Sequence, residues 1–162
     1  METITAMTFF GILTFAYATY NCSEEIAMSD FDPKKFFNEK WYLTHDGDTS
    51  STVCQKFSTN ETEGEALIVE SGYKKFESKG ITGKFQCDGG KKNKEQYSFK
   101  CKSDECGSES NNFDVDFTIV SAGDEDFAVI CRSVTFSDGV KDDDYIVLDR
   151  NIDEKASCTN GC

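Results

Sequence analysis

The side chains with the most evident chemistry are carboxylates, and they are concentrated in the last sixty residues of this 162-residue chain. Residues 103–162 contain fifteen Asp or Glu against four Lys or Arg, so this segment carries −11 of the formal net charge of −13. A field of that strength attracts a positively charged surface and repels nucleic acid and anionic lipid. The composition therefore predicts a cationic protein partner and argues against nucleic-acid or membrane binding.

Catalytic chemistry is hard to assemble from this sequence. A Ser or Cys nucleophile usually needs a neighbouring base, and the only histidine is His45, which is expected on an exposed loop. Acidic runs such as 142–144 lack the spacing of a calcium loop and are typical of solvated loops. Zinc is disfavoured because no CxxC pair is present. The sequence predicts a protein that is not an enzyme and needs no cofactor or metal.

The N-terminal residues predict secretion. Residues 9–13 are mostly apolar and residues 16–18 fit the small-x-small cleavage rule, so 1–18 is interpreted as a signal peptide, with a buried N-terminal helix or strand as the alternative. All eight cysteines follow residue 18, as expected for disulfides formed in an oxidising compartment. Asn60 begins a glycosylation sequon between two expected strands, which favours a loop position.

The mature chain, residues 19–162, is predicted to be a single all-β domain. The expected strands are 41–44, 54–59, 66–73, 83–87, 96–101, 113–120, 127–134 and 145–149. Turn signals separate them at 46–48, 88–90, 122–124 and 137–139. Eight strands spaced by about ten residues favour a β-barrel or a sandwich.

Two of the expected strands show how their faces are used. Every second residue from Phe113 to Ile119 is apolar, whereas Asp114 and Asp116 fall between them, so the aromatic face is expected inside and the acids in water. Residues 127–130 are apolar throughout. One face of that strand is therefore expected to bring an apolar residue to the surface.

Residues 31–42 resemble the opening signature of a lipocalin, in which a short helical turn leads into a first strand whose Trp closes the barrel floor. Asp32 and Pro33 would start the turn as N-cap and first helical residue. Trp41 would be the floor residue, and Arg150 would pack over its ring in a cation–π contact worth about 1 kcal/mol.

Five further blocks resemble the triabin family of salivary lipocalins from blood-feeding bugs: 54–57, 72–78, 95–103, 127–133 and 143–148. The resemblance spans the mature chain. It implies an eight-stranded antiparallel lipocalin-type β-barrel that is disulfide-bonded and secreted in saliva.

The family's cysteine pattern implies a set of disulfides. Carried over by position, the pairs are Cys22–Cys131, Cys54–Cys158 and Cys87–Cys101. Cys106 and Cys162 have no counterpart, and we expect them to pair with each other; the alternatives are displacement of Cys158 or an intermolecular bridge. Each disulfide would contribute about 2–4 kcal/mol.

The resemblance also implies a function. Triabin-like proteins bind thrombin at its cationic fibrinogen-recognition exosite, through a Phe that begins the seventh strand and acidic residues after the eighth. In this sequence the Phe directly follows three acids, and an aromatic anchor with charged neighbours is the usual composition of a binding hot spot and its rim. The ordinary alternatives are a core Phe and solubilising charge. The candidate partner-binding residues are Phe127, Asp149, Asp153, Glu154, Asp124, Glu125 and Asp126.

Two other functions stay open. The barrel could carry a small platelet agonist, thromboxane or a related eicosanoid, as relatives in the same salivary group do. The many Phe and Tyr predict a crowded interior, and amine capture would need an inward carboxylate, whereas Asp114 and Asp116 point away from the apolar face. The acidic surface could instead bind a different cationic haemostatic protein.

Overall fold

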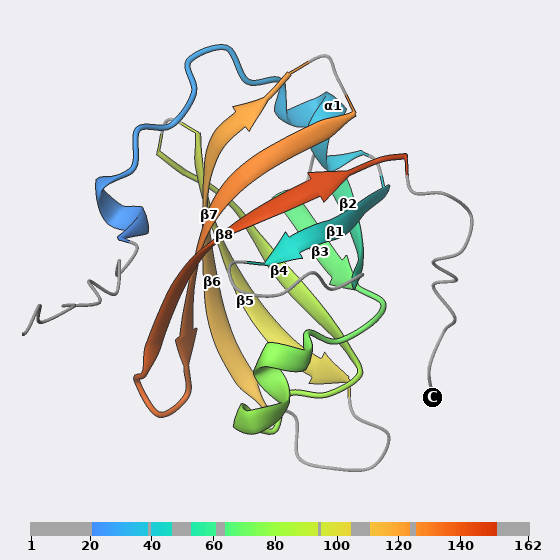
Figure 1. The fold of residues 1–162 in the computed structure, drawn as a ribbon, viewed down its shortest axis with the longest axis vertical. Helices are drawn as coiled ribbons and strands as arrows, with labels where there is room; N and C mark the ends of the chain where they lie inside the picture. The colour runs from blue at the N-terminus through green and yellow to red at the C-terminus, as the bar shows by residue number, and fades with distance from the viewer. Residues whose placement is uncertain are drawn as a thin grey trace, which may run out of the picture.

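Within the described residues, eight antiparallel strands follow chain order around a closed barrel, and β8 pairs with β1 to complete it (Figure 1). The computed structural model describes residues 21–38, 40–46, 53–60, 64–93, 95–104, 111–123 and 126–151. The strands are β1 (Lys40–Asp46), β2 (Val53–Asn60), β3 (Gly64–Val69), β4 (Lys84–Asn93), β5 (Gln96–Asp104), β6 (Asn112–Ala122), β7 (Phe127–Phe136) and β8 (Lys141–Asp149). The predicted all-β, lipocalin-type barrel is confirmed.

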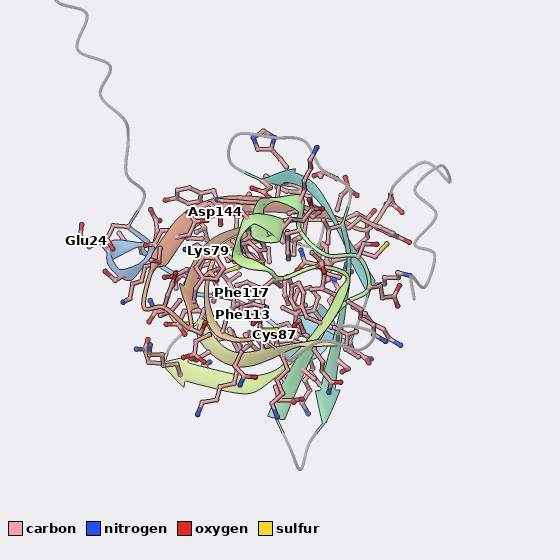
Figure 2. All side chains as sticks on the ribbon, turned by 90° about the horizontal axis from the view of Figure 1, so that it is seen from below. Glu24, Lys79, Cys87, Phe113, Phe117 and Asp144 are labelled. Atoms are coloured by element: carbon pink, nitrogen blue, oxygen red, sulfur yellow. A yellow bond between two sulfur atoms is a disulfide. The ribbon has the colours of Figure 1, made fainter. Side chains whose placement is uncertain are left out.

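The alternation of residue types along β6 separates the inner wall from the outer wall. Phe113 and Phe117 are buried, whereas Asp114 is exposed, as the sequence predicts. Figure 2 looks along the barrel and shows both phenylalanines pointing into the ring of strands. Strand β6 therefore supplies aromatic surface to the core and carboxylates to solvent.

One end of the barrel is closed by α1 (Pro33–Phe37) (Figure 1). The Asp32 side chain caps this helix by accepting hydrogen bonds from the backbone N–H of Lys34 and Lys35, and Pro33 occupies the first turn. The indole N–H of Trp41 donates to the Phe36 carbonyl oxygen at 3.1 Å.

Arg150 packs over the ring of the same indole. Its guanidinium carbon is 4.2 Å from the Trp41 ring centroid, so the predicted cation–π contact is present. Among the described residues, no helix is long and apolar enough to cross a bilayer.

The opposite end is covered by the 3₁₀-helix η2 (Lys74–Lys79), which lies across the barrel opening (Figures 1 and 2). Its Phe76 is buried and its ring centroid lies 6.0 Å from that of Phe113 and 5.6 Å from that of Phe136. The helix ends at Gly80, whose φ of 73° is a conformation that suits glycine.

Aromatic rings occupy the space between the two ends. Near α1, the ring centroid of Phe37 lies 5.5 Å from that of Phe57 and 4.7 Å from that of Tyr97. Further along, Phe99 and Phe117 are 5.4 Å apart. These separations are ordinary packing distances for aromatic pairs. The crowded interior predicted from the ring count is present.

Two of the predicted disulfides are present. Cys22–Cys131 attaches the N-terminal segment to the outer face of β7, with a Cα–Cα distance of 5.4 Å. Cys87–Cys101 joins register partners on β4 and β5 inside the barrel. Cys54 is also disulfide-bonded. Its predicted partner Cys158 and the predicted pair Cys106–Cys162 lie outside the described residues, so those pairings stay predictions.

Several predicted boundaries are wrong. The predicted turn at 88–90 lies inside β4, which continues to Asn93. The expected strand 66–73 ends at Val69. Asn60 ends β2, and the remainder of its sequon lies outside the described residues. His45 is an exposed residue of β1 rather than of a loop.

The glycines of β4 explain the mistaken turn. A Cβ added to Gly89 would lie 1.9 Å from the Ser98 carbonyl oxygen, so this glycine permits close approach of β5 rather than a reversal of the chain. A Cβ on neighbouring Gly90 would meet only the Glu65 carboxylate, at 2.8 Å. That contact is with the far end of a flexible side chain, which can move away.

We therefore predict that Gly89→Ala destabilises the barrel and Gly90→Ala does not. The Gly89 change forces two backbones apart, and overpacking of this kind costs about 1–3 kcal/mol. Urea unfolding of both variants measures the difference. Equal stabilities for the two variants would show that β4 and β5 separate without penalty.

Candidate functional site

The sequence-predicted anchor and one predicted acid lie side by side on the outer wall. Phe127 begins β7, Asp149 ends β8, and the two are register partners. Directly opposite residues of an antiparallel pair project from the same face with Cβ atoms about 5 Å apart. Phe127 is 40% exposed, whereas the next residue, Ala128, is fully buried. Phe127 is thus an outward ring and not a core residue.

The carboxylates next to this ring are held by the chain that follows β8. The backbone N–H of Asn151 donates to Asp149 Oδ1 at 2.7 Å, and the Asn151 side-chain amide donates to the Asp126 carboxylate. The backbone N–H of Arg150 donates to the Asp126 carbonyl oxygen at 2.8 Å. Neither carboxylate forms an ion pair within the described part of the chain, so both can meet a partner's charge.

We call Asp126, Phe127 and Asp149 the Phe127 surface. The other predicted binding residues, Asp124, Glu125, Asp153 and Glu154, lie outside the described residues.

The acidic run 142–144 is not a solvated loop, which corrects the interpretation of the sequence. It forms the start of β8, and each carboxylate has a partner within the protein. Asp142 lies 2.9 Å from Lys75 Nζ of η2. Asp143 accepts from Ser133 Oγ at 2.6 Å and from the Cys22 backbone N–H at 3.0 Å.

Asp144 faces the interior, where it pairs with the buried Arg132 of β7. Arg132 Nε and Nη2 lie 2.9 and 2.5 Å from the two carboxylate oxygens, a bidentate arrangement. The guanidinium carbon also lies 4.4 Å from the Tyr73 ring centroid and 5.1 Å from that of Phe76, so η2 packs on this charge.

A second inward carboxylate, Asp46, approaches the same arginine at 3.8 Å. It reaches the interior because the pairing of β1 with β8 is irregular between Leu43 and His45. A β-bulge of this kind inserts an unpaired residue, here Thr44, and reverses the face on which later residues lie. Leu43 and Asp46 therefore both point inward.

We call Arg132, Asp144 and Asp46 the buried charge cluster. Its presence corrects part of the argument against amine ligands, which assumed that no carboxylate faces inward. Asp114 and Asp116 do face outward, but Asp46 and Asp144 do not. Since Arg132 already contacts these carboxylates and the rings of Tyr73 and Phe76, the cluster is committed to holding η2 and the residue that precedes it.

The two carboxylates have opposite pKa shifts. Burial raises the pKa of Asp46 above its usual value of 3.8, Arg132 partly offsets this, and repulsion from Asp144 adds to it. Burial alone would also raise the pKa of Asp144, but attraction and hydrogen bonds from Arg132, with Lys75, outweigh it and lower that pKa below 3.8.

We predict that Asp144→Asn lowers the free energy of unfolding at neutral pH by about 3 kcal/mol, because it leaves a buried guanidinium without its bidentate partner. Asp46→Asn should leave stability unchanged or raise it, because it removes a charge that burial disfavours. Urea unfolding at neutral pH compares these two isosteric changes. A similar loss for both would contradict the opposite shifts.

Asp144 and Asp46 should affect the pH dependence of stability in opposite directions. The lowered pKa of Asp144 means that its stabilisation is present above the unfolded value of 3.8 and is lost as pH falls through the folded value. The raised pKa of Asp46 means that its contribution is present below the unfolded value and is lost as pH rises through the folded value. Both variants should therefore converge on the wild type in acid.

The part of the chain that the structure describes contains no group of three or more His, Cys, Asp or Glu that could hold a metal ion.

A closed antiparallel barrel, plugged by aromatic rings and carrying an exposed aromatic–acidic surface, defines a lipocalin-type binding protein. The sequence profile of the Triabin family matches residues 17–159. The chain is 57% identical over 156 residues to Dimiconin of Triatoma dimidiata, covering 93% of this chain and 78% of that protein. It is 53% identical over 154 residues to Triabin of Meccus pallidipennis, covering 93% and 92%. The chain belongs to the triabin family.

More distant relatives agree with the fold. Triafestin-2 of Triatoma infestans is 32% identical over 166 residues, covering 95% of this chain and 81% of that protein. The crystal structure of the LTBP1 complex with LTC4 superposes with a TM-score of 0.59 at 24% identity, covering 86% of this chain and 85% of that one. That likeness concerns the barrel alone.

Proposed function

We propose that this protein is a secreted salivary anti-haemostatic protein that inhibits thrombin by occupying its cationic fibrinogen-recognition exosite. The observation that carries the proposal is the Phe127 surface, in which an exposed ring lies in register with Asp149 and beside Asp126. Its placement on the seventh and eighth strands matches the binding mode that the triabin resemblance implies. The 53% identity to Triabin over 92% of its length supports the same reading.

The two kinds of side chain would have different roles. Phe127 would enter the apolar groove of the exosite, where a desolvated aromatic anchor contributes most of the affinity. Asp126 and Asp149 would meet basic residues at the rim and mainly increase the association rate. We propose the same role in association for Asp124, Glu125, Asp153 and Glu154, which lie outside the described residues.

Exosite binding would block fibrinogen and leave the catalytic centre of thrombin open. We therefore predict that the protein prolongs thrombin-induced fibrinogen clotting while cleavage of a small chromogenic substrate by the same thrombin changes little. Unchanged clotting at micromolar protein would contradict the proposal.

A small apolar ligand in the barrel is the weaker candidate, because packed rings already lie along the interior from Phe37 to Phe117 and from Phe76 to Phe136. Calorimetry with a stable thromboxane analogue separates the two functions. A heat of binding without any effect on thrombin would favour the carrier function. Inhibition of a different cationic haemostatic protein would mean that the Phe127 surface binds that protein instead of thrombin.

Phe127→Ala should weaken thrombin binding by about 2 kcal/mol, roughly thirtyfold in Kd, at low and high salt alike. The matched control is Val140→Ala, because Val140 is also exposed, at 46%, but lies at the far end of the barrel in the β7–β8 turn. Surface plasmon resonance measures both. Equal affinities for the two variants would remove Phe127 from the interface.

Asp149→Asn should lower the association rate at low ionic strength, and the effect should fade as salt screens the charge. Asp138→Asn removes the same charge from the β7–β8 turn at the far end, where Asp138 pairs with Lys79 at 2.9 Å. Stopped-flow association kinetics over a salt series compare the two variants. A loss that persists at high salt would mean that Asp149 forms a desolvated contact rather than steering the partner.

A further inference from the structure

We infer that the binding surface continues from β7 and β8 onto β1, where Tyr42 is a second aromatic contact and Lys40 marks the limit of the partner's footprint. This inference rests on the proposed function and names further residues of the same interface. It commits to one occupant, a basic protein surface with an apolar groove.

The register of β7, β8 and β1 places Tyr42 beside the Phe127 surface. Asp149 is the register partner of Phe127 on β7 and also of Tyr42 on β1. Directly opposite residues share a face, so the three side chains form one row across three adjacent strands, with the carboxylate between two rings.

Burial gives the orientation of Tyr42. Its neighbours in β1, Trp41 and Leu43, are 1% and 0% exposed and belong to the core. Because side chains alternate along a strand, Tyr42 must project outward, and it is half-buried rather than hidden. A partly packed tyrosine is pre-ordered, so little conformational entropy is lost when a partner covers it.

The row has the chemistry that a basic side chain requires. A partner's Arg or Lys placed over Asp149 would meet a carboxylate and could lie against a ring on either side, which adds a cation–π contact to the ion pair. Phe127 alone offers this on one side only. Tyr42 therefore makes the surface specific for a cation set within an apolar groove.

Lys40 lies where the acidic part of the outer surface ends. It lies two residues before Tyr42 on the same face, its Nζ is 5.8 Å from the Tyr42 ring centroid, and it pairs with Glu70 at 3.2 Å. Its register partner on β2 is Lys56, which is also exposed. A cationic partner is thus attracted over β7, β8 and the Tyr42 edge of β1 and is repelled by Lys56 on β2.

The first test is Tyr42→Ala in surface plasmon resonance with thrombin. We expect Kd to rise about tenfold at low and high salt, while Tyr42→Phe, which keeps the ring, binds within about twofold of the wild type. Val140→Ala is the control for loss of an exposed apolar group. Thermal unfolding of each variant confirms that the barrel is intact.

The second test uses a charge reversal that should improve binding. Lys40→Glu and Lys100→Glu change the net charge equally, but Lys100 is an exposed residue of β5, four strands from β1 around the barrel. Lys40→Glu should raise the association rate at low salt several-fold more than Lys100→Glu, because only charges within about a Debye length of the partner act strongly.

The outcomes separate the two proposals. If the wild type binds thrombin and Phe127→Ala weakens it while Tyr42→Ala does not, the extension onto β1 is wrong and the proposed function stands. Equal effects of Lys40→Glu and Lys100→Glu would likewise overturn the boundary at Lys40. If the wild type does not bind thrombin at all, the proposed function fails, and the inference fails with it.

Discussion

The pairing of β7 with β8 is the constraint on which both the interior and the outer surface depend. In this ladder Arg132 is opposite Asp144 inside the barrel, and Phe127 is opposite Asp149 outside it. A slip of one residue would turn one strand's inward set outward and leave the buried guanidinium without its carboxylate. An uncompensated buried charge of this kind costs several kcal/mol. The inner ion pair therefore selects the register that places an acid beside the exposed ring.

Local patterns in the sequence predict the eight strands and part of the core, but not all of the strand bounds. Period-two alternation identified the inward face of β6, and the same rule could have identified Asp144, which shares its face with Ile146 and Leu148. A run of three consecutive acids is more typical of a solvated loop, and for 142–144 that prediction is wrong. Asp46 could not have been assigned in this way, because the bulge at Thr44 that turns it inward is a property of the pairing with β8 and not of its own segment. The turn predicted at 88–90 is wrong for a similar reason, because the close approach of β5 to Gly89 depends on the tertiary structure.

Individual residues of the candidate surface can be selected from the sequence, but their positions relative to one another cannot. The sequence indicated that one face of β7 brings an apolar residue to the surface, and the family resemblance selected Phe127 and Asp149. Neither could show that the two are cross-strand neighbours. Tyr42 cannot be assigned to this surface from the sequence, because it is distant along the chain and joins the row only through the pairing of β1 with β8. Barrel closure thus creates a surface that no single segment encodes.

Not every carboxylate of an acidic protein acts on its partner. Asp142 is paired with Lys75, Asp143 is hydrogen-bonded to Ser133, and Asp144 holds Arg132, so these charges are compensated where they stand. At physiological ionic strength the Debye length is about 8 Å, so a partner responds to nearby uncompensated charge rather than to the net charge of the chain. Asp126 and Asp149 satisfy that condition beside Phe127. Beyond Tyr42, Lys40 of β1 is paired with Glu70, and its neighbour Lys56 on β2 forms no ion pair within the described residues. The spatial order of carboxylates, aromatic rings and lysines around the barrel, rather than the net charge of −13, therefore determines where a cationic surface can dock.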